Sequence, residues 1–224
     1  LWLVLNRLEH YRLVLRLQVF RERTFLSNKE WKLLSTCDDR LFGYKFTKIM
    51  NIFYLNPKPK ECAEEHLDKH VVKMIIEYAQ LMSTAHRLLD GVPYIDKTSN
   101  GRNIKRWRLE EPFETVMMKA SHINHPSAVW ARSNKQNYIW LQRMWFYLCK
   151  EYTYRYGKIH AVENRMRDEL YVYPKNIPDG EFYPPTPAMP DECKVPGNAL
   201  ESYHRYYRER KNHFAKWTKR EIPS

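Results

Sequence analysis

The stretch that most constrains the fold is residues 62–89, CAEEHLDKHVVKMIIEYAQLMSTAHRLL. It contains no Gly or Pro and is rich in residues that favour helices, so it predicts one long helix. At 100° per residue its apolar side chains fall on one half of the helical cylinder. They are Leu67, Val71, Met74, Ile75, Tyr78, Leu81, Met82, Ala85 and Leu89. We expect this half to be buried.

The other half of this predicted helix carries an unusual file of polar groups. They are His66, His70, Lys73, Glu77, Gln80, Thr84 and Arg87. One interpretation is an ordinary solvated face. The other is a stripe that lines a cleft, where an amine beside a carboxylate and two imidazoles has shifted pKa values and performs chemistry. The second interpretation makes Glu77, Lys73, His66 and His70 the candidate catalytic residues.

A metal site is a competing hypothesis for the same helix. His66 and His70 are spaced i,i+4, and Glu77 or His125 would be a third ligand. The local order is EHLDKH, which differs from the HExxH pattern of zinc enzymes, and the spacing fixes no third ligand. The sequence therefore predicts no metal and no cofactor.

Composition and charge indicate the class of partner. The net charge is +12, with 38 Lys and Arg against 26 Asp and Glu, which favours a polyanion, most simply double-stranded DNA. Six Gly are too few for a turn-rich β fold or a phosphate-cradling loop. No apolar run is long enough for a membrane span. The four Cys are scattered without a CxxC pair and predict reduced thiols in a cytoplasmic protein.

The sequence divides at Met50. Residues 1–49 are rich in Leu and Arg, and we interpret them as an N-terminal extension, either upstream read-through or a weakly attached helical segment. Met50 begins MNIFYLNPKPKECAEEH, which resembles a natural amino terminus: a strand-like entry, a turn with Pro, and then the long helix. Residues 50–224 are predicted to form a single helical domain.

A basic loop is predicted after the long helix. Residues 90–108 are rich in Gly, Pro, Asn and Ser, and cations cluster around an aromatic residue. Arg106 and Trp107 are the candidate phosphate-contacting and base-stacking residues of this loop. A merely solvated insertion is the alternative.

A second helical block is predicted between residues 121 and 160. Pro126 suits a first helical position with His125 just before it, Ser133 is a possible second N-cap, and Gly157 is a C-terminal stop. Most aromatics here belong to the core. The polar candidates for DNA contacts are Asn124, His125, Arg132, Asn137 and Arg155. For Arg155, an i,i+4 ion pair with Glu151 is the alternative.

The C-terminal part is predicted to be a strap followed by a helix. Residues 173–197 hold too many Pro for a helix or a central strand. A capping box, Asn198 with Glu201, starts a last helix that continues to about Trp217 and combines aromatic with basic residues, including Arg208 and Lys211 as DNA contacts. The predicted fold is therefore all-α, a compact bundle of three main helices plus short helices, with a Pro-rich strap.

Five segments resemble one family in the same order. They are DKHVVKM (68–74), NHPSAVWAR (124–132), EYTYRYGK (151–158), AMPDECK (188–194) and YYRERKNHFAKW (206–217). Together they resemble a family of small, mostly uncharacterised proteins of tailed bacteriophages, and the resemblance covers residues 50–224. It implies a phage protein in the cytoplasm of an infected host cell.

A weaker resemblance suggests an activity. The order of a strand-like entry, an acidic-basic helix, a helix after an N-H-P turn and an aromatic-basic tail is similar to the pyrimidine-dimer DNA glycosylases of the endonuclease V type. That family is small, basic and all-helical, and an amine attacks the sugar C1′ with help from a helix carboxylate before the strand is cleaved. The resemblance implies Glu77 as the carboxylate, His66 as its neighbour, and Arg87 and Arg132 as phosphate contacts.

The chain departs from that family at the nucleophile. The family uses the α-amine of a Thr exposed by removal of Met, whereas Met50 is followed by Asn51. Lys73 is the amine that this sequence offers instead. The expected function is thus a DNA-binding protein, with DNA glycosylase and AP lyase activity on damaged or modified pyrimidines. A base-modifying transferase and a non-enzymatic basic helical module that binds nucleic acid or a protein are the alternatives.

Overall fold

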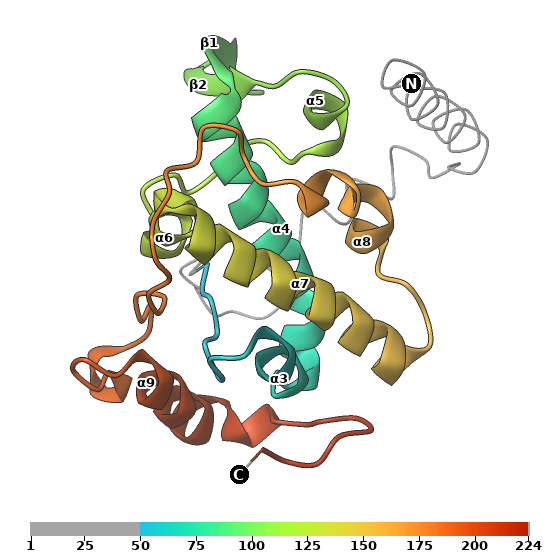
Figure 1. The fold of residues 1–224 in the computed structure, drawn as a ribbon, viewed down its shortest axis with the longest axis vertical. Helices are drawn as coiled ribbons and strands as arrows, with labels where there is room; N and C mark the ends of the chain where they lie inside the picture. Colours follow the sequence, from blue (N-terminus) through green and yellow to red (C-terminus); the bar gives the residue numbers. More distant parts are fainter. Residues whose placement is uncertain (1–49, 224) are drawn as a thin grey trace, which may run out of the picture. The chain divides into compact units, whose positions relative to one another are not determined.

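A computed structural model describes residues 50–223 (Figure 1), and the predictions for residues 1–49 lie outside them. The fold is mostly helical, as predicted, with one small two-stranded sheet. Its two long helices are α4 (Asp68–Asp90) and α7 (Lys135–Tyr156). They cross and pack against each other, and the indole of Trp145 on α7 donates a hydrogen bond of 2.8 Å to the carbonyl of Ile75 on α4.

The predicted single helix over residues 62–89 is in fact two helices. Helix α3 (Pro59–Glu64) ends before His66, and α4 begins at Asp68. Leu67 between them is extended (φ −67°, ψ 156°) and fully buried. The break leaves carbonyl groups without helical partners, and the side chain of Arg155 donates to those of Glu64 and His66. The break in the helix is therefore stabilised by a residue that lies outside residues 62–89.

The strand-like entry is extended and buried. Residues 50–55 lie in the core, and Ile52 has no exposed surface. The side chain of Asn51 donates to the carbonyl of Ala188 and accepts a hydrogen bond from the hydroxyl of Tyr203. The entry thereby ties the start of this unit to its C-terminal part.

The predicted loop over residues 90–108 is a β-hairpin. Strands β1 (Val92–Lys97) and β2 (Asn103–Arg108) pair antiparallel, with Tyr94 opposite Arg106. The prediction was wrong because Gly and Asn marked the turn correctly while the short alternation on either side was not recognised. Gly101 has φ +79°, a left-handed conformation that favours glycine at the turn.

The helix boundaries around α7 follow the predicted signals with one shift. Helix α5 is Phe113–Val116 and α6 is Pro126–Ser133, which begins at the expected Pro. The N-cap of α7 is Asn134, not Ser133, and its side chain accepts a hydrogen bond of 2.9 Å from the backbone N–H of Asn137. Gly157 ends α7 in a left-handed conformation, as predicted.

Between α7 and the strap the chain forms helix α8 (Ala161–Met166) and a 3₁₀ turn (Glu169–Tyr171). The strap itself, residues 173–197, is irregular, as predicted, apart from a 3₁₀ turn at Asp191–Cys193. The strap buries Ile177, Met189 and Cys193 in the core. The thiols of Cys62, Cys149 and Cys193 are free and buried, and Cys37 lies outside the described residues.

The last predicted helix is shorter than expected. Helix α9 is Ala199–Tyr206, and the chain continues as a π-helical turn (Tyr207–Lys211) and a 3₁₀ turn (Asn212–Phe214). The Asn198 side chain caps α9 by accepting from the N–H of Glu201 at 3.0 Å. The chain then leaves the helix because residues 216–220 bond to α4 and α7. We call residues 199–223 the C-terminal tail.

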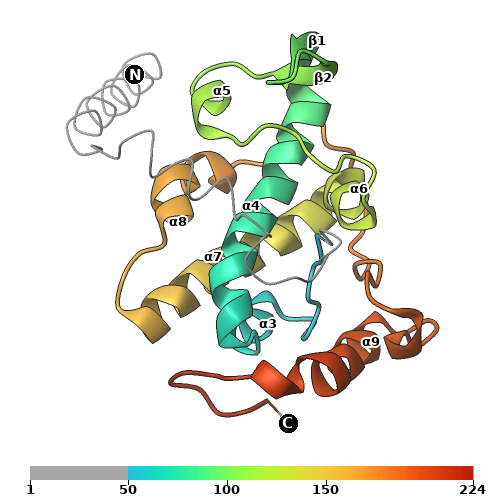
Figure 2. The ribbon, with the colours of Figure 1, turned by 180° about the vertical axis from the view of Figure 1, so that it is seen from behind.

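The hairpin and the C-terminal tail lie at opposite ends of α4. In both views β1 and β2 extend from the C-terminal end of α4, while α3 and α9 lie near its N-terminal end (Figures 1 and 2). Because α4 has 23 residues, these ends are about 34 Å apart. The two most basic parts of the chain are thus well separated.

Candidate nucleic-acid interface

The predicted amine and carboxylate of α4 lie together. Lys73 Nζ is 3.1 Å from Glu77 Oε1, one helical turn away. The Lys73 side chain is 64% exposed, whereas that of Glu77 is only 17% exposed. The pair therefore has a solvent-facing amine next to a largely covered carboxylate.

His66 is buried inside the protein, so the expected polar face does not include it. Its Nδ1 lies 2.6 Å from the carbonyl of Cys62 and its Nε2 lies 2.9 Å from the hydroxyl of Tyr78. That hydroxyl accepts from the N–H of Phe53, so its proton points to Nε2 and the neutral ring donates from Nδ1. Burial lowers the pKa of His66 to about 4. This histidine joins the entry to α4 and holds no cleft-facing position.

His70 is also covered. Its Nδ1 lies 2.6 Å from the hydroxyl of Tyr207, and its ring stacks on Phe53 at 4.0 Å between centroids. Burial first, and then repulsion from His66 and from the cations of Lys211 and Lys73, lower the pKa of His70 well below its usual value. The neutral imidazole is thus enclosed by Phe53 and Tyr207 near the start of α4.

Arg87 is a structural residue, which corrects its expected role as a phosphate contact. It is 1% exposed, and all its N–H groups have acceptors within the protein. The guanidinium donates to the carboxylate of Glu114 at 2.6 Å and to the carbonyls of Trp107, Glu114, Met117 and Met118. Arg87 therefore fixes the base of the hairpin and the following loop to α4.

Glu114 completes this attachment. Desolvation opposes its ionisation, but the N–H of Leu109 and the cations of Arg87 and Lys119 outweigh that effect and lower the pKa of Glu114 to about 2. Its Oε2 accepts from Leu109 at 2.9 Å and its Oε1 from Lys119 at 2.9 Å. A carboxylate that no sequence signal singled out thus secures the hairpin to the core.

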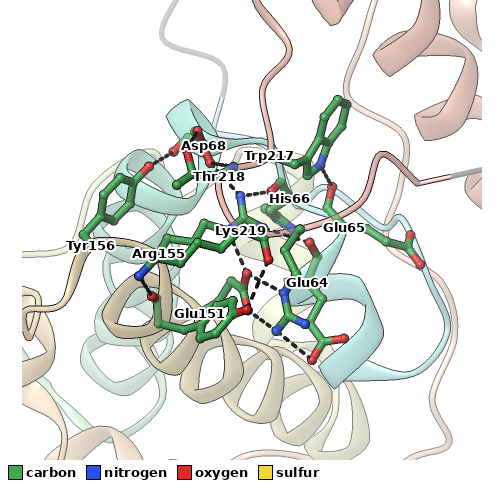
Figure 3. A network of polar contacts seen from close by, with 12 residues as sticks. Glu64, Glu65, His66, Asp68, Glu151, Arg155, Tyr156, Trp217, Thr218 and Lys219 are labelled. Atoms are coloured by element: carbon green, nitrogen blue, oxygen red, sulfur yellow. Dashed lines mark hydrogen bonds and ion pairs between the residues drawn. The ribbon is translucent and has the colours of Figure 1, made fainter.

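Arg155 is likewise buried, at 3% exposure, and the predicted ion pair with Glu151 is present at 2.7 Å. Its other donors bind Asp68 Oδ1 at 2.9 Å and the carbonyls of His66 and Glu64 at 2.8 Å each (Figure 3). Four of its five N–H groups are thus bound within the protein, and its burial leaves no surface for a phosphate. The interpretation as a structural ion pair is the one that the geometry supports.

The C-terminal tail completes this network. Arg220 donates to both oxygens of Glu151, at 2.7 and 3.0 Å, and to Glu64 at 3.1 Å. The hydroxyl and the N–H of Thr218 donate to the carboxylate of Asp68 at 2.7 and 3.0 Å (Figure 3). We call Glu64, Asp68, Glu151, Arg155, Thr218 and Arg220 the tail network. It fastens the tail to the start of α4 and the end of α7.

The remaining predicted contacts of the second block differ in exposure. Asn137 is fully buried between Trp130, Ser133 and Tyr183, so its expected base or phosphate contact is not available. His125 is half-buried and caps α6 by accepting from Ser127. Asn124 is exposed and Arg132 is half-buried. Of these four residues, only Asn124 and Arg132 have accessible side chains that do not cap a helix.

Arg208 and Lys211 lie on the surface of the tail. Arg208 pairs with Glu201 at 2.6 Å. The amine of Lys211 lies over the rings of Tyr206 and Phe214, at 4.7 and 5.7 Å from their centroids. The amine of Lys69 on α4 lies over the same Phe214 ring at 4.5 Å.

The arginines of the tail are paired with carboxylates. Arg205 lies 3.9 Å from Glu209, and Arg210 pairs with Glu192. With the pairs of Arg208 and Arg220, every arginine of the tail has an acidic partner. The arginine charge of this segment is therefore balanced within the fold, whereas its lysines, Lys211, Lys216 and Lys219, have no carboxylate within 4.0 Å among residues 50–223.

The hairpin has the opposite arrangement. Its cations are Lys97, Arg102, Lys105, Arg106 and Arg108. Within residues 50–223 none of them lies within 4.0 Å of a carboxylate. Arg108 instead lies over the ring of Tyr94 at 5.0 Å, and Lys105 over Trp107 at 5.5 Å. The predicted residues Arg106 and Trp107 thus belong to an unbalanced basic and aromatic surface.

No group of three or more His, Cys, Asp or Glu residues in the described part of the chain is arranged to hold a metal ion. Among residues 50–223, none of the helices has an apolar stretch sufficient to span a membrane. No protein-family model matches the chain, and comparison with curated proteins and with solved structures also gave no significant match.

Proposed function

We propose that the protein binds nucleic acid, with double-stranded DNA as the expected partner, and that the β1–β2 hairpin makes the main contact. The observation that supports this proposal is the set of five hairpin cations without a carboxylate partner among the described residues. Phosphates would supply the missing negative charge and release counterions from the duplex. The net charge of +12 favours the same encounter at long range.

The proposal is tested by the salt dependence of binding to a labelled duplex, measured by fluorescence anisotropy with the full chain. We expect the logarithm of affinity to fall linearly with the logarithm of salt concentration. A matched control is a duplex of unrelated sequence, which should bind with the same slope if the phosphates dominate. Absence of binding at low salt would refute the proposal.

The pair of Lys73 and Glu77 supports a second candidate function, cleavage at an abasic or damaged pyrimidine site. The amine remains 64% exposed, so a substrate can reach it, and the carboxylate of Glu77 lies 3.1 Å from it. A neutral lysine amine attacks the C1′ aldehyde of an opened abasic sugar and forms a Schiff base as water leaves. An α-amine at Met50 or Asn51 would not be accessible to a substrate, because both residues are buried.

Borohydride trapping separates the two candidates. An abasic duplex incubated with the full chain and borohydride should give a covalent adduct that disappears in Lys73→Ala and is weakened in Glu77→Gln. Lys69→Ala is the matched control, because Lys69 lies on the same helix end but over the ring of Phe214. Salt-dependent binding without any adduct would leave the protein as a binding module.

A further inference from the structure

The two faces of the hairpin differ in exposure. Side chains of directly paired residues share a face, and faces alternate along each strand. On one face the central residues Tyr94, Ile104 and Arg106 are half-buried, whereas Val92 and Arg108 at the base are exposed. On the other, which we call the open face, Ile95 and its partner Lys105 are exposed, and Trp107 at the base is half-buried. Away from its base, the hairpin therefore presents one partly covered face and one face available to a partner.

The open face combines an apolar strip with a basic border. Ile95 is 66% exposed, and Pro93, two residues before it, is exposed as well. Lys105 lies opposite Ile95, and Lys97 follows two residues later on the same strand. Exposure of the Ile95 side chain to water is unfavourable, so a partner that covers it would stabilise the complex. The flanking cations favour a polyanion over an apolar protein surface as that partner.

The hairpin base is held firmly. The guanidinium of Arg87 binds the carbonyl of Trp107 at 2.7 Å, and Gly91 packs so closely that a Cβ there would lie 2.9 Å from the Cβ of Trp107. The strands beyond this base extend from the end of α4 (Figure 2). A short ribbon with a fixed base is already ordered before it binds, so binding a ligand costs less conformational entropy.

We infer that the open face enters the minor groove of duplex DNA, where Ile95 acts as an apolar wedge that partly unstacks one base step and bends the duplex. This inference rests on the proposed function. In some DNA-binding proteins β-strands lie in a groove of the duplex. The side chains that insert between base steps from the minor groove are apolar residues such as Ile and Pro. Lys97 and Lys105 would contact the phosphates that border the groove. The half-buried face carries Tyr94 and Arg106 away from the bases.

The test measures duplex bending and affinity separately. A duplex of about 30 base pairs with a dye at each end reports bending by resonance energy transfer when it is saturated with the full chain. We expect a bend within about 20–90° for the unchanged protein. Ile95→Ala should lose most of the bend and bind about tenfold more weakly with an unchanged salt slope. Ile95→Leu should restore the bend because it keeps an apolar wedge.

Two control variants separate the wedge from simple attraction. Lys105→Ala should lower the salt slope by about 0.9 and keep the bend at saturation. Val172→Ala, which changes a valine of 50% exposure outside the hairpin, should change neither quantity. Circular dichroism confirms that each variant is folded.

The outcomes of the two proposals are distinguishable. Failure of the unchanged protein to bind the duplex refutes the proposed function itself. Binding without bending, or an Ile95→Ala variant that bends the duplex like the unchanged protein, overturns the wedge alone. Equal affinity for a single strand of the same length also overturns the wedge, because a single strand has no groove.

Discussion

The hairpin and the C-terminal tail are both basic, yet the fold treats their charges in opposite ways. The arginines of the tail pair with carboxylates, and Arg220 pairs with Glu64 and Glu151 in the tail network. The hairpin cations have no such partners within residues 50–223 and lie beside aromatic rings or in solvent. The number of basic residues in a segment is therefore a poor guide to its attraction for a polyanion. The fraction left without an internal counterion is the relevant quantity.

The largest effect is expected from the tail network. Arg155→Ala should lower the free energy of unfolding by about 3–5 kcal/mol, because it leaves the carboxylate of Glu151 in the interior with one partner fewer. Urea denaturation of the full chain measures this loss. Arg208→Ala, which removes an exposed pair, should cost about 0–1 kcal/mol. Equal losses in the two variants would contradict the structural role of Arg155.

The next effect concerns DNA affinity and tests the comparison directly. Changing Lys97, Arg102 and Lys105 together to Ala should lower the salt slope by about 2.7 if each contacts one phosphate. The matched tail variant changes Arg205, Arg208 and Arg210 to Ala. It should leave the slope nearly unchanged because these residues are paired internally. A larger loss in the tail variant would invert the assignment of the two regions.

A smaller effect on stability is expected from acid, and it should act at both ends of α4. Burial lowers the pKa of His66, near the tail network, and of His86, near the hairpin, to about 4 from an ordinary value of 6.5. The unfolded chain therefore takes up protons first as the pH falls. Stability from these residues is complete above pH 6.5 and is lost between about pH 6.5 and pH 4.

The expected loss is about 2 kcal/mol for each histidine between pH 7 and pH 5, measured by urea denaturation. His66→Gln and His86→Gln should each remove about 2 kcal/mol of the pH dependence, and part of the remainder comes from His70, whose pKa burial also lowers. The salt slope of DNA binding by the folded protein should stay constant over the same range, because His66 and His86 both lie outside the hairpin. A constant free energy of unfolding from pH 7 to pH 5 would contradict the neutral, buried state of both imidazoles.

The smallest effect is expected at the hairpin base. In Gly91→Ala the new Cβ would clash with the carbonyl oxygen of Arg87 and lie 2.9 Å from the Cβ of Trp107. The backbone must shift, which should cost about 1–3 kcal/mol of stability and weaken DNA binding through the displaced hairpin. Val92→Ala is the control, because Val92 is 69% exposed and should matter by about 0.5 kcal/mol or less. Unchanged stability in Gly91→Ala would show that the close contact relaxes freely.

Local signals in the sequence predicted a substantial part of the fold. The apolar half of residues 68–90 is buried, Pro126 and Gly157 bound helices, and Asn198 caps α9. These signals depend on neighbouring residues alone. The strap was also predicted, because its Pro content excludes regular elements whatever surrounds it.

The errors arose where distant residues decide the outcome. Leu67 interrupts the predicted long helix because Arg155, far along the chain, provides donors for the carbonyls freed there. The polar file of α4 contained Arg87, whose acceptors lie in β2, in α5 and in the two residues after α5. A periodicity analysis assigns such residues to a solvated or functional face, because it cannot see the partners that bury them. The proximity of Lys73 and Glu77, by contrast, follows from helical spacing alone.

The break between α3 and α4 has a consequence for the order of folding. The carbonyls it frees are satisfied by side chains that lie far along the chain, among them the indole of Trp217, which donates to Glu65 across 152 residues. Contacts of such long sequence separation form late, since closing a large loop precedes any gain from it. The N-terminal end of α4 should therefore remain the least protected part of the helix in amide hydrogen exchange until the tail has docked. Folding would then proceed along α4 from its centre towards Asp68.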